Sequence, residues 1–395
     1  MNVWTRGAFG AQGAASMRPA RPLAAMVDAR YPRPDEDSGS LDQISYVKIF
    51  RSLGFDVAFA AVDEFDRPPP ARRAALEAMG VRCAAGPEFA SVKAWVEAIA
   101  AASPVFFLSR VDSGARCLED IRRLAPRARV VFNAVDLRHL REARGAWLHR
   151  DPAALALAWI VRGRELRAAR LSDAVVVSSS AERDLLARGA PSAKVFVIPL
   201  VREGPFERSA DFSTRAGIGF IGGFSHAPNV DAVAWFLDAV WPVIRSCLPG
   251  AVFYVIGSNL PARLARRADA GVEFVGHASD IEPWLARLRL TVAPLRFGAG
   301  AKGKVVSSLT RGVPCVATPV AAEGMGLVPN QGIVIAGTPE QFVDEAVSLY
   351  REPSRWMDVS ESGLAFARGN FSLARGVELT RGLLAAVGAE PPAPC

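Results

Sequence analysis

The chain has 395 residues, half of them apolar and 22% charged, and its formal net charge is +7. This length exceeds one ordinary core and suits two domains of about 150 to 200 residues each, and the apolar content can bury both. The modest positive charge allows attraction to anionic substrates or to an anionic membrane face, and we expect no nucleic-acid partner.

The first half of the chain alternates short β-rich runs with helical stretches. The expected strands are Leu23 to Asp28, Phe55 to Val62, Val105 to Ser109, Val130 to Asn133, Ala174 to Ser178 and Val195 to Ile198. Such alternation predicts a parallel sheet flanked by helices. We assign residues 23–200 to this first domain. Residues 1–22 lack the apolar core of a signal peptide and are expected to form a disordered tail.

Residues 201–215 are polar, have no clear period and are expected to form a linker. The alternation then starts again, with strands expected at Ile218 to Ile221, Val252 to Ile256, Val272 to Val275, Leu290 to Ala293, Val313 to Ala317 and Ile333 to Ala336. The second α/β domain is assigned to residues 216–370. An amphipathic stretch follows in residues 371–388, and we expect it to pack back across the domains as a helix. Ligands of such units bind beyond the carboxyl ends of the strands, so the site is predicted in a cleft between the halves.

No run approaches 18 apolar residues, and the longest, Ala153 to Val161, lies in an expected helix. Any membrane contact is therefore expected to be peripheral, at the inner face. The chain has five cysteines, an odd number without a C-x-x-C pair: Cys83, Cys117, Cys247, Cys315 and Cys395. This pattern favours a reducing cytoplasm and no zinc site.

The segment from Ala293 to Gly312, APLRFGAGAKGKVVSSLTRG, joins an expected strand to a glycine-rich basic loop and a short helix. Its glycines let the backbone approach an anion closely, and the amino terminus of the helix adds free N–H groups. The loop also concentrates positive charge, because two of the chain's five lysines lie in it. The residues expected to hold a phosphate group are Arg296, Gly298, Gly300, Gly303, Lys302 and Lys304.

The glycines and lysines of this loop also suggest three other interpretations. Gly298, Gly300 and Gly303 satisfy the G-x-G-x-x-G pattern of dinucleotide sites, but the pattern lies deep in the chain and the following helix is only about two turns long. The P-loop pattern is rejected because Val305 stands where a Ser or Thr is required. A glycine-rich turn with solvated basic residues stays an alternative.

A second loop at the predicted cleft reads GFIGGFSHAPNVD, from Gly219 to Asp231. Gly222 and Gly223 turn the chain after the strand, and His226 can donate a hydrogen bond to a phosphate or to a departing oxyanion. A new helix is expected to begin near Asn229, which is interpreted as a plain helix cap. An exposed loop histidine is the alternative for His226.

Three further loops carry polar residues at strand ends. In Asp28 to Ser40 the acidic side chains are expected to bind sugar hydroxyls of an acceptor, with Ser38 and Ser40 as candidate helix caps. In Val135 to Glu142, Asp136 and His139 are candidates to orient or deprotonate an attacking hydroxyl, although Asp136 can instead cap a helix. In Ala321 to Met325, Glu323 and the amide of Gly324 are candidates to bind ribose or sugar hydroxyls. A solvated acidic loop and a solvated glutamate in a turn are the respective alternatives.

Together, in this order, these segments resemble the GT-B glycosyltransferases of the family-4-like group with a group 1 C-terminal domain. The motifs that carry the resemblance are PRPDEDSGS at 32–40, VDLRHLRE at 135–142, FIGGFSHAPNVDAVAWF at 220–236, FVGHASDIEPWL at 274–285, APLRFGAGAKGKVVSSLTRGVPCVAT at 293–318 and AAEGM at 321–325. The resemblance covers residues 23 to 387. It implies two Rossmann-like parallel-sheet domains that face each other across a cleft.

The resemblance also implies a function: retaining transfer of a sugar from a nucleotide-sugar donor in the C-terminal domain to a glycan or lipid-linked acceptor in the N-terminal domain. It implies no essential metal and no cofactor besides the donor substrate. The candidate catalytic residues are Asp136, His139, Arg296 and Lys302. The candidate donor-binding residues are Gly222, Gly223, His226, Gly298, Gly300, Lys302, Lys304, Ser307, Glu323 and Gly324. Fixed cations and N–H dipoles there would stabilise the departing diphosphate.

The chain departs from the pattern at the two glutamates that many relatives use to contact the sugar and the ribose. Alignment on Gly312 puts Ala299 and Ser307 at these positions. A serine can bind a ribose hydroxyl, but more weakly than a carboxylate does. Two alternatives therefore remain, a non-catalytic glycosyltransferase-like binding module and a sugar-nucleotide epimerase.

Overall fold

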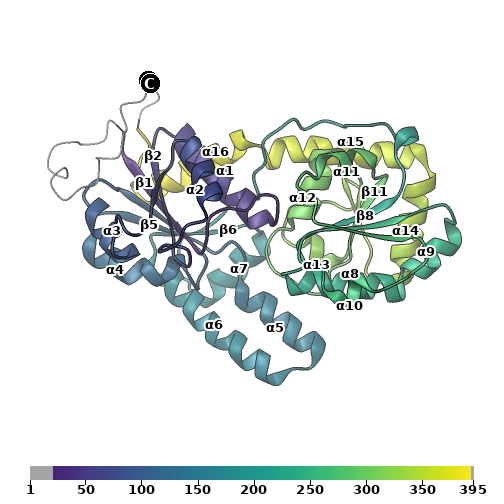
Figure 1. Ribbon diagram of the computed structural model, residues 1–395, viewed down its shortest axis with the longest axis horizontal. Coiled ribbons are helices and arrows are strands. Elements are labelled where there is room, and N and C mark those ends of the chain that lie inside the picture. The colour runs from purple at the N-terminus through teal and green to yellow at the C-terminus, as the bar shows by residue number, and fades with distance from the viewer. Residues whose placement is uncertain (1–20, 393–395) are drawn as a thin grey trace.

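The computed structural model describes residues 21–392, so the tail predicted for residues 1–22 lies almost wholly outside the described part. Two α/β domains lie side by side, and a helical hairpin projects below the first (Figure 1). Each domain contains one sheet whose neighbouring strands all pair in parallel. The expectation of two parallel-sheet domains is therefore confirmed.

The first sheet has seven strands in the order β3-β2-β1-β4-β5-β6-β7, and the second has six in the order β10-β9-β8-β11-β12-β13. The strands of the first sheet are β1 Leu23–Asp28, β2 Asp56–Ala61, β3 Arg82–Ala84, β4 Val105–Ser109, β5 Arg129–Asn133, β6 Ala174–Val177 and β7 Val195–Val197. Those of the second are β8 Ile218–Ile221, β9 Phe253–Ile256, β10 Val272–Gly276, β11 Leu290–Ala293, β12 Cys315–Ala317 and β13 Ile333–Ile335. In both sheets the order reverses beside the first strand, between β1 and β4 and between β8 and β11, which marks the binding crevice of such sheets.

Helices cover both sheets. In the first domain they are α1 Ser38–Ser52, α2 Pro70–Ala78, α3 Val92–Ile99, η1 Gly114–Cys117, α4 Leu118–Leu124, α5 Arg138–His149, α6 Pro152–Leu171 and α7 Ser180–Gly189. After the linker, which contains η2 Phe212–Thr214, they are α8 Ala227–Ala239, α9 Trp241–Cys247, α10 Ala262–Ala265, α11 Glu282–Arg287, α12 Gly303–Thr310, α13 Pro319–Ala322, α14 Pro339–Arg351, α15 Pro353–Asn370 and α16 Leu373–Ala386.

The central strands are apolar because both of their faces are covered. All six residues of β1, LAAMVD, are buried, which is typical of a parallel strand between two helical layers. Its last residue, Asp28, is 3% exposed and accepts a hydrogen bond from Arg110 Nε at 2.9 Å. This buried pair lies at the carboxyl end of β1, where the sheet faces the second domain.

The chain crosses back to the first domain near its end. α15 packs on the second domain, and Ser372 then forms a bridge with Arg202 of the linker. Leu383 and Leu384 of α16 join the core that contains Ile49 and Phe50 of α1. The last helix therefore completes the core of the N-terminal domain.

Three local expectations were wrong. β3 was not expected, because a three-residue edge strand that begins with an arginine carries no clear pattern. Helix α8 begins at Ala227, with His226 as its N-cap residue, so Asn229 is not its cap. Helix α1 is capped by Asp37, whose carboxylate accepts from Ser40 N at 2.8 Å, and not by Ser38 or Ser40.

Candidate functional site

The glycine-rich loop between β11 and α12 lies directly against the N-terminal domain. Gly300 has a φ of 66°, and a Cβ there would lie 3.0 Å from both Asp136 Cβ and Ser178 Oγ. The next amide, Ala301 N, donates to Ser178 Oγ at 2.8 Å. A Cβ at Gly303 would collide with Ser38 Oγ. Glycine is thus required where the loop touches both the β6–α7 turn and the start of α1.

Lys302 and Lys304 are held by neutral oxygens. Lys302 is 8% exposed, and its ammonium group donates to Ala299 O at 2.9 Å and to Gly300 O. Lys304 Nζ donates to Asn229 Oδ1 at 2.9 Å and lies 5.1 Å from the centre of the Phe220 ring. Burial lowers the pKa of Lys302 and lowers that of Lys304 to about 7. Within residues 21–392 neither lysine forms an ion pair.

Arg296, expected in the phosphate site, pairs with a carboxylate instead. Its Nε donates to Asp231 Oδ2 at 2.9 Å, and its Nη2 contacts the other oxygen. This hydrogen-bonded carboxylate raises the pKa of Arg296. Asp231 lies in the second turn of α8, so Arg296 connects the loop after β11 to α8 within the C-terminal domain.

The β8–α8 loop approaches the N-terminal domain closely. A Cβ at Gly223 would lie 2.9 Å from Glu36 O, and one at Gly222 would lie 2.8 Å from Asn229 Nδ2. Asn229 donates to Gly223 O at 2.7 Å while accepting from Lys304, so it ties this loop to α12. His226 is exposed to the cleft. Enclosure by the cleft walls, and then Arg141, lower its pKa to about 4, so its imidazole is neutral at neutral pH.

Asp136 and His139 follow β5 but differ in position. Asp136 lines a cavity of about 310 Å³ at the carboxyl ends of β1, β4 and β5 and forms an ion pair with Arg141. It does not cap α5, whose N-cap residue is Leu137. His139 is 7% exposed, and its Nδ1 contacts Glu165 Oε2 of α6. His139 therefore joins two helices and lines neither this cavity nor the larger one between the domains.

Glu323 and Gly324 form another contact between the domains. Arg144 of α5 binds the Glu323 carboxylate with both terminal nitrogens, at 2.7 and 2.8 Å, and also donates to Gly298 O at 2.9 Å. This pairing lowers the pKa of Glu323. Gly324 O accepts from Ser180 N at 2.9 Å. Glu323 is therefore engaged by an arginine in this closed arrangement, and the turn is not merely solvated.

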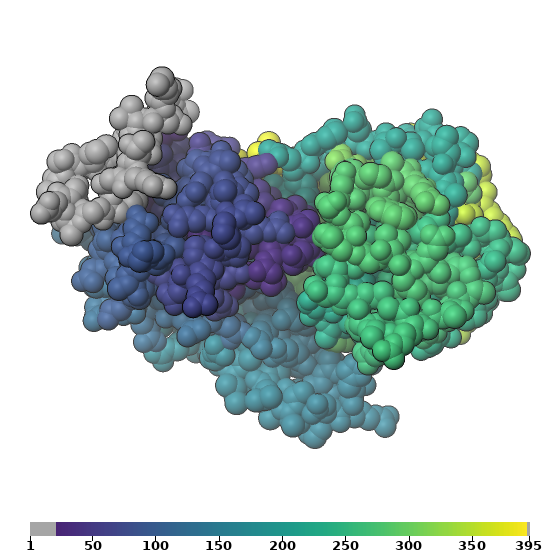
Figure 2. Space-filling model, viewed as in Figure 1, coloured from purple at the N-terminus to yellow at the C-terminus, as the bar shows by residue number. Residues whose placement is uncertain are grey.

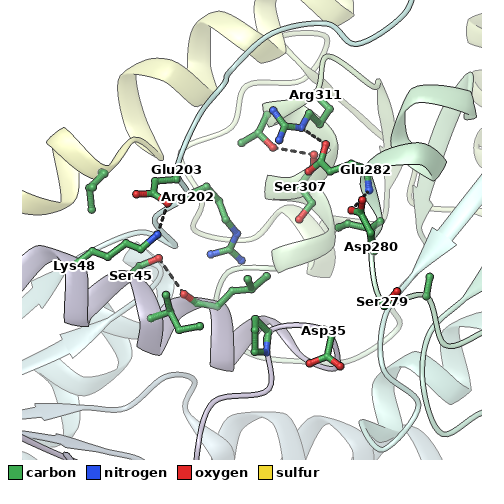
Figure 3. A pocket seen from close by; sticks show the side chains of 17 residues that line it. Asp35, Ser45, Lys48, Arg202, Glu203, Ser279, Asp280, Glu282, Ser307 and Arg311 are labelled. Atoms are coloured by element: carbon green, nitrogen blue, oxygen red, sulfur yellow. Dashed lines mark hydrogen bonds and ion pairs between the residues drawn. The ribbon is translucent and has the colours of Figure 1, made fainter. Parts of the chain in front are cut away.

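Ser307 lines a second cavity, of about 400 Å³, which lies between the two domains. Figure 3 shows Arg202 of the linker and Ser307 of α12 projecting toward the same space, with Asp280 and Glu282 along one wall. Arg202 Nη2 donates to Ser38 Oγ at 2.8 Å, but its buried Nε has no hydrogen-bond partner among the described residues. Burial lowers the pKa of Arg202. The cavity is thus lined by a cation close to the ribose position implied by the resemblance.

The acidic loop after β1 is neutralised by arginines. Asp35 pairs with Arg72, and Asp37 pairs with Arg30. These pairs leave the carboxylates less available for acceptor hydroxyls than the sequence suggested, while Gly39 lies beside the guanidinium of Arg110.

Several residues of the site were not singled out from the sequence. Glu182 is 1% exposed, accepts from Leu137 N at 2.8 Å, and has its pKa raised to about 7 by burial. The negative charge of Glu182 also raises the pKa of Lys302, against the larger lowering by burial. Ser178 ends the predicted strand Ala174 to Ser178 and Ser179 directly follows it, so the rule that strand ends line the cleft also applied to this turn. Arg144 and Arg202 carry no local signal.

Among residues 21–392 no group of three His, Cys, Asp or Glu side chains is arranged to hold a metal ion. Over the same range no helix is both long and apolar enough to cross a membrane.

Residues 215–352 match the family described as glycosyl transferases group 1. No curated protein matches the chain. Among solved structures, sucrose-phosphate synthase from Thermosynechococcus elongatus is similar with a TM-score of 0.68 and 12% identity, over 93% of this chain and 100% of that one. Anabaena HepE in complex with UDP-glucose is similar with a TM-score of 0.67 and 14% identity, over 92% and 100% of the two chains.

The pneumococcal O-GlcNAc transferase GtfA, in complex with UDP and GlcNAc, is similar with a TM-score of 0.56 and 14% identity, over 76% of this chain and 61% of that one. At these identities the likeness shows the fold, which is GT-B. The resemblance that the sequence motifs predicted is thereby confirmed, with the family match in the C-terminal domain.

Proposed function

We propose that this protein is a retaining glycosyltransferase that moves a sugar from a nucleotide-sugar donor to a hydroxyl group of a glycan or lipid-linked acceptor. The acceptor oxygen forms a bond to the anomeric carbon, the bond from that carbon to the phosphate oxygen breaks, and the diphosphate leaves with the electron pair. The acceptor proton passes to the departing phosphate oxygen. The group 1 match and the UDP-sugar ligands of similar GT-B structures support this choice of chemistry.

One observation carries the proposal: two partly or fully buried ammonium groups, Lys302 and Lys304, face neutral oxygens in the cleft. A buried cation without an ion pair is costly, and an incoming diphosphate would supply the missing negative charge. The first amides of α12, Gly303 and Lys304, have no intrahelical acceptor and would donate to the same group. These donors would stabilise the charge that develops on the leaving diphosphate without a metal ion.

The two cavities suit the two substrates. The larger one, lined by Ser307 and Arg202, would hold the nucleoside, since its volume lies in the range of small-molecule sites. The cavity beside Asp136 would hold the acceptor, because it opens at the carboxyl ends of the N-terminal strands. In this arrangement Asp136 orients the acceptor hydroxyl, and neutral His226 donates to the sugar or the phosphate.

Calorimetric titration with UDP, compared with other nucleoside diphosphates, tests the proposal. Lys302→Ala should weaken binding of the preferred diphosphate at least about fivefold, because a charge-assisted hydrogen bond is lost. Lys93→Ala is the matched control, since Lys93 is an exposed lysine on α3 of the N-terminal domain. Binding of no nucleoside diphosphate by the folded wild-type protein would refute the proposal.

A non-catalytic module that binds nucleotide or glycan is the second candidate, and Ala299 and Ser307 favour it. Ala299 is 7% exposed, so even its methyl group is packed and no carboxylate stands at that point of the loop. Tight diphosphate binding combined with no release of diphosphate from any nucleotide sugar, with a panel of acceptors, would favour the module over the enzyme.

A further inference from the structure

The helical hairpin of α5 and α6 exposes an unusual amount of apolar surface. Among the described residues, seven large hydrophobic side chains are exposed, and five of them belong to this hairpin: Trp147, Leu157, Trp159, Ile160 and Leu171. Trp147 is 79% exposed, and Trp159 and Ile160 are each 61% exposed. Four of the five lie between Trp147 and Ile160, on either side of the turn at Arg150 and Asp151. Figure 2 shows the hairpin, in teal, projecting below the body of the molecule.

Apolar and basic residues occupy different halves of α6. On the half next to the turn, the exposed side chains are Ala153, Ala156, Leu157, Trp159 and Ile160. On the half next to the domain, the exposed charged side chains are Arg164, Arg167 and Arg170, and Leu171 at the end of the helix is also exposed. The outer end of the hairpin is therefore apolar, and the exposed arginines lie behind it, next to the domain.

The hairpin also accounts for most of the net positive charge of the chain. Residues 138–171 contain eight arginines and three acidic residues, a surplus of five in a chain whose net charge is +7. Arg164 and Arg167 pair with Asp112 and Glu119 of the domain body. Among the described residues, Arg150 and Arg162 form no ion pair, and Arg162 lies 5.2 Å from the centre of the Trp159 ring. Two unpaired cations thus flank the exposed tryptophans.

We propose that the outer end of this hairpin docks on the surface of an anionic phospholipid bilayer. Tryptophan favours the boundary between headgroups and acyl chains, and arginine can remain at the phosphates while its apolar neighbours insert. A second copy of the chain fits this surface less well, because a symmetric interface would bring the same positive hairpin against itself. A projecting convex end also fits a deformable bilayer better than it fits a preformed groove.

The placement of the hairpin gives this docking a role, which rests on the proposed function. Arg138, Arg141 and Glu142 in the first turns of α5 line the cavity assigned to the acceptor. The helix has 12 residues, so it leads from this cavity to the exposed end over about 18 Å. Docking would hold the acceptor cavity at the distance from the bilayer at which the headgroup of a lipid-linked acceptor lies. The acceptor class is thereby narrowed to membrane-anchored glycolipids.

Flotation of the full chain with vesicles tests the docking. The wild-type protein should float with vesicles of phosphatidylcholine and phosphatidylglycerol and bind vesicles of pure phosphatidylcholine much less. The double variant Trp159→Ser/Ile160→Ser should lower binding to the anionic vesicles at least about tenfold, because the inserted apolar surface is lost. Val243→Ser/Val328→Ser is the matched control, since both valines are exposed on the C-terminal domain.

A second pair of variants tests the charge. Arg150→Ala/Arg162→Ala should weaken binding to the anionic vesicles, whereas Arg263→Ala/Arg266→Ala, which removes two exposed arginines near α10, should not. Each variant is also titrated with UDP in solution, which reports on the folded donor site without any membrane.

Unchanged flotation of the Trp159→Ser/Ile160→Ser protein would overturn the proposal. So would a wild-type dimer that this variant dissociates in sedimentation equilibrium without any vesicle binding. Vesicle binding without nucleotide binding would instead refute the proposed function and leave the docking intact.

Discussion

The ammonium group of Lys304 is buried, so water solvates its charge poorly. Burial lowers its pKa from the ordinary value of 10.5 to about 7, and burial lowers the pKa of Lys302 as well. At neutral pH part of the free protein therefore lacks one of these charges. A bound diphosphate stabilises the charged form and raises both pKa values, so binding takes up protons.

Affinity for a nucleoside diphosphate should consequently fall as the pH rises from 7 to 9, through the range in which the lysines of the free protein lose their protons. Calorimetry in buffers of different ionisation enthalpy should detect proton uptake near pH 8. Lys304→Arg is the control, because a guanidinium stays charged over this range and should flatten the profile. An equally steep profile in Lys302→Arg/Lys304→Arg would assign the pH dependence to other groups.

Ser307 is one of the two residues at which the sequence leaves the family pattern, and its place in the larger cavity makes a direct test possible. Ser307→Glu should strengthen UDP binding about three- to tenfold, because a carboxylate can accept a charge-assisted hydrogen bond from a ribose hydroxyl. Ser307→Gln has the same length without the charge and should give a smaller gain. A parallel rise in sugar transfer would indicate a weakened enzyme. Stronger binding without any turnover would favour the binding module.

Among the helices, the α5–α6 hairpin contains two glycines in opposite surroundings. A Cβ at Gly163 of α6 would meet nothing within 4 Å, whereas one at Gly145 of α5 would lie 2.9 Å from Phe297 Cε2 of the C-terminal domain. Gly163→Ala should therefore raise the free energy of unfolding by about 0.5 to 1 kcal/mol, since alanine favours the helix. Gly145→Ala should lose this gain, because the ring of Phe297 must shift. Denaturant unfolding of both variants measures the difference, and equal stabilisation would show that α5 does not press on Phe297.

Individual elements differ in how well the sequence predicts them. Strand β1 is a run of five apolar residues followed by an aspartate, and its bounds were predicted correctly because periodicity and composition agree there. The loop before α12 was also identified, since glycines and lysines concentrate in it. β3 was missed because three residues at a sheet edge give no pattern. The contact of His139 with Glu165 was not predicted, because a histidine at a strand's carboxyl end looks the same in sequence whether it faces a cleft or a neighbouring helix.

For the whole molecule, the sequence could not show how the two domains close. Arg144 and Glu323 are 179 residues apart, and no local signal pairs them. Arg202 appeared to be part of a polar linker, yet it lines the larger cavity and contacts Ser38. Local physical chemistry therefore predicted which loops lie at the cleft, whereas the partners of their side chains depend on the relative position of the two domains.

The pair of Arg144 and Glu323 is the clearest contact that holds the cleft closed. Arg144→Ala removes both hydrogen bonds to the carboxylate and the one to Gly298 O. We expect a more open molecule, with a larger radius of gyration in small-angle scattering and slower sugar transfer, because the loop of Lys302 would no longer be held against the N-terminal domain. The stability of each domain should change by no more than about 1 kcal/mol, since both side chains are partly exposed.

Arg167→Ala serves as the matched control, because Arg167 also pairs with a glutamate, Glu119, but within one domain. It should leave the radius of gyration unchanged. If Arg144 acts through Glu323, then Arg144→Ala and Glu323→Ala should open the molecule to the same extent, and the double variant should add nothing. Additive opening would mean that the two residues hold the cleft by separate contacts. In that case the bond from Arg144 to Gly298 O, rather than the ion pair, positions the glycine-rich loop.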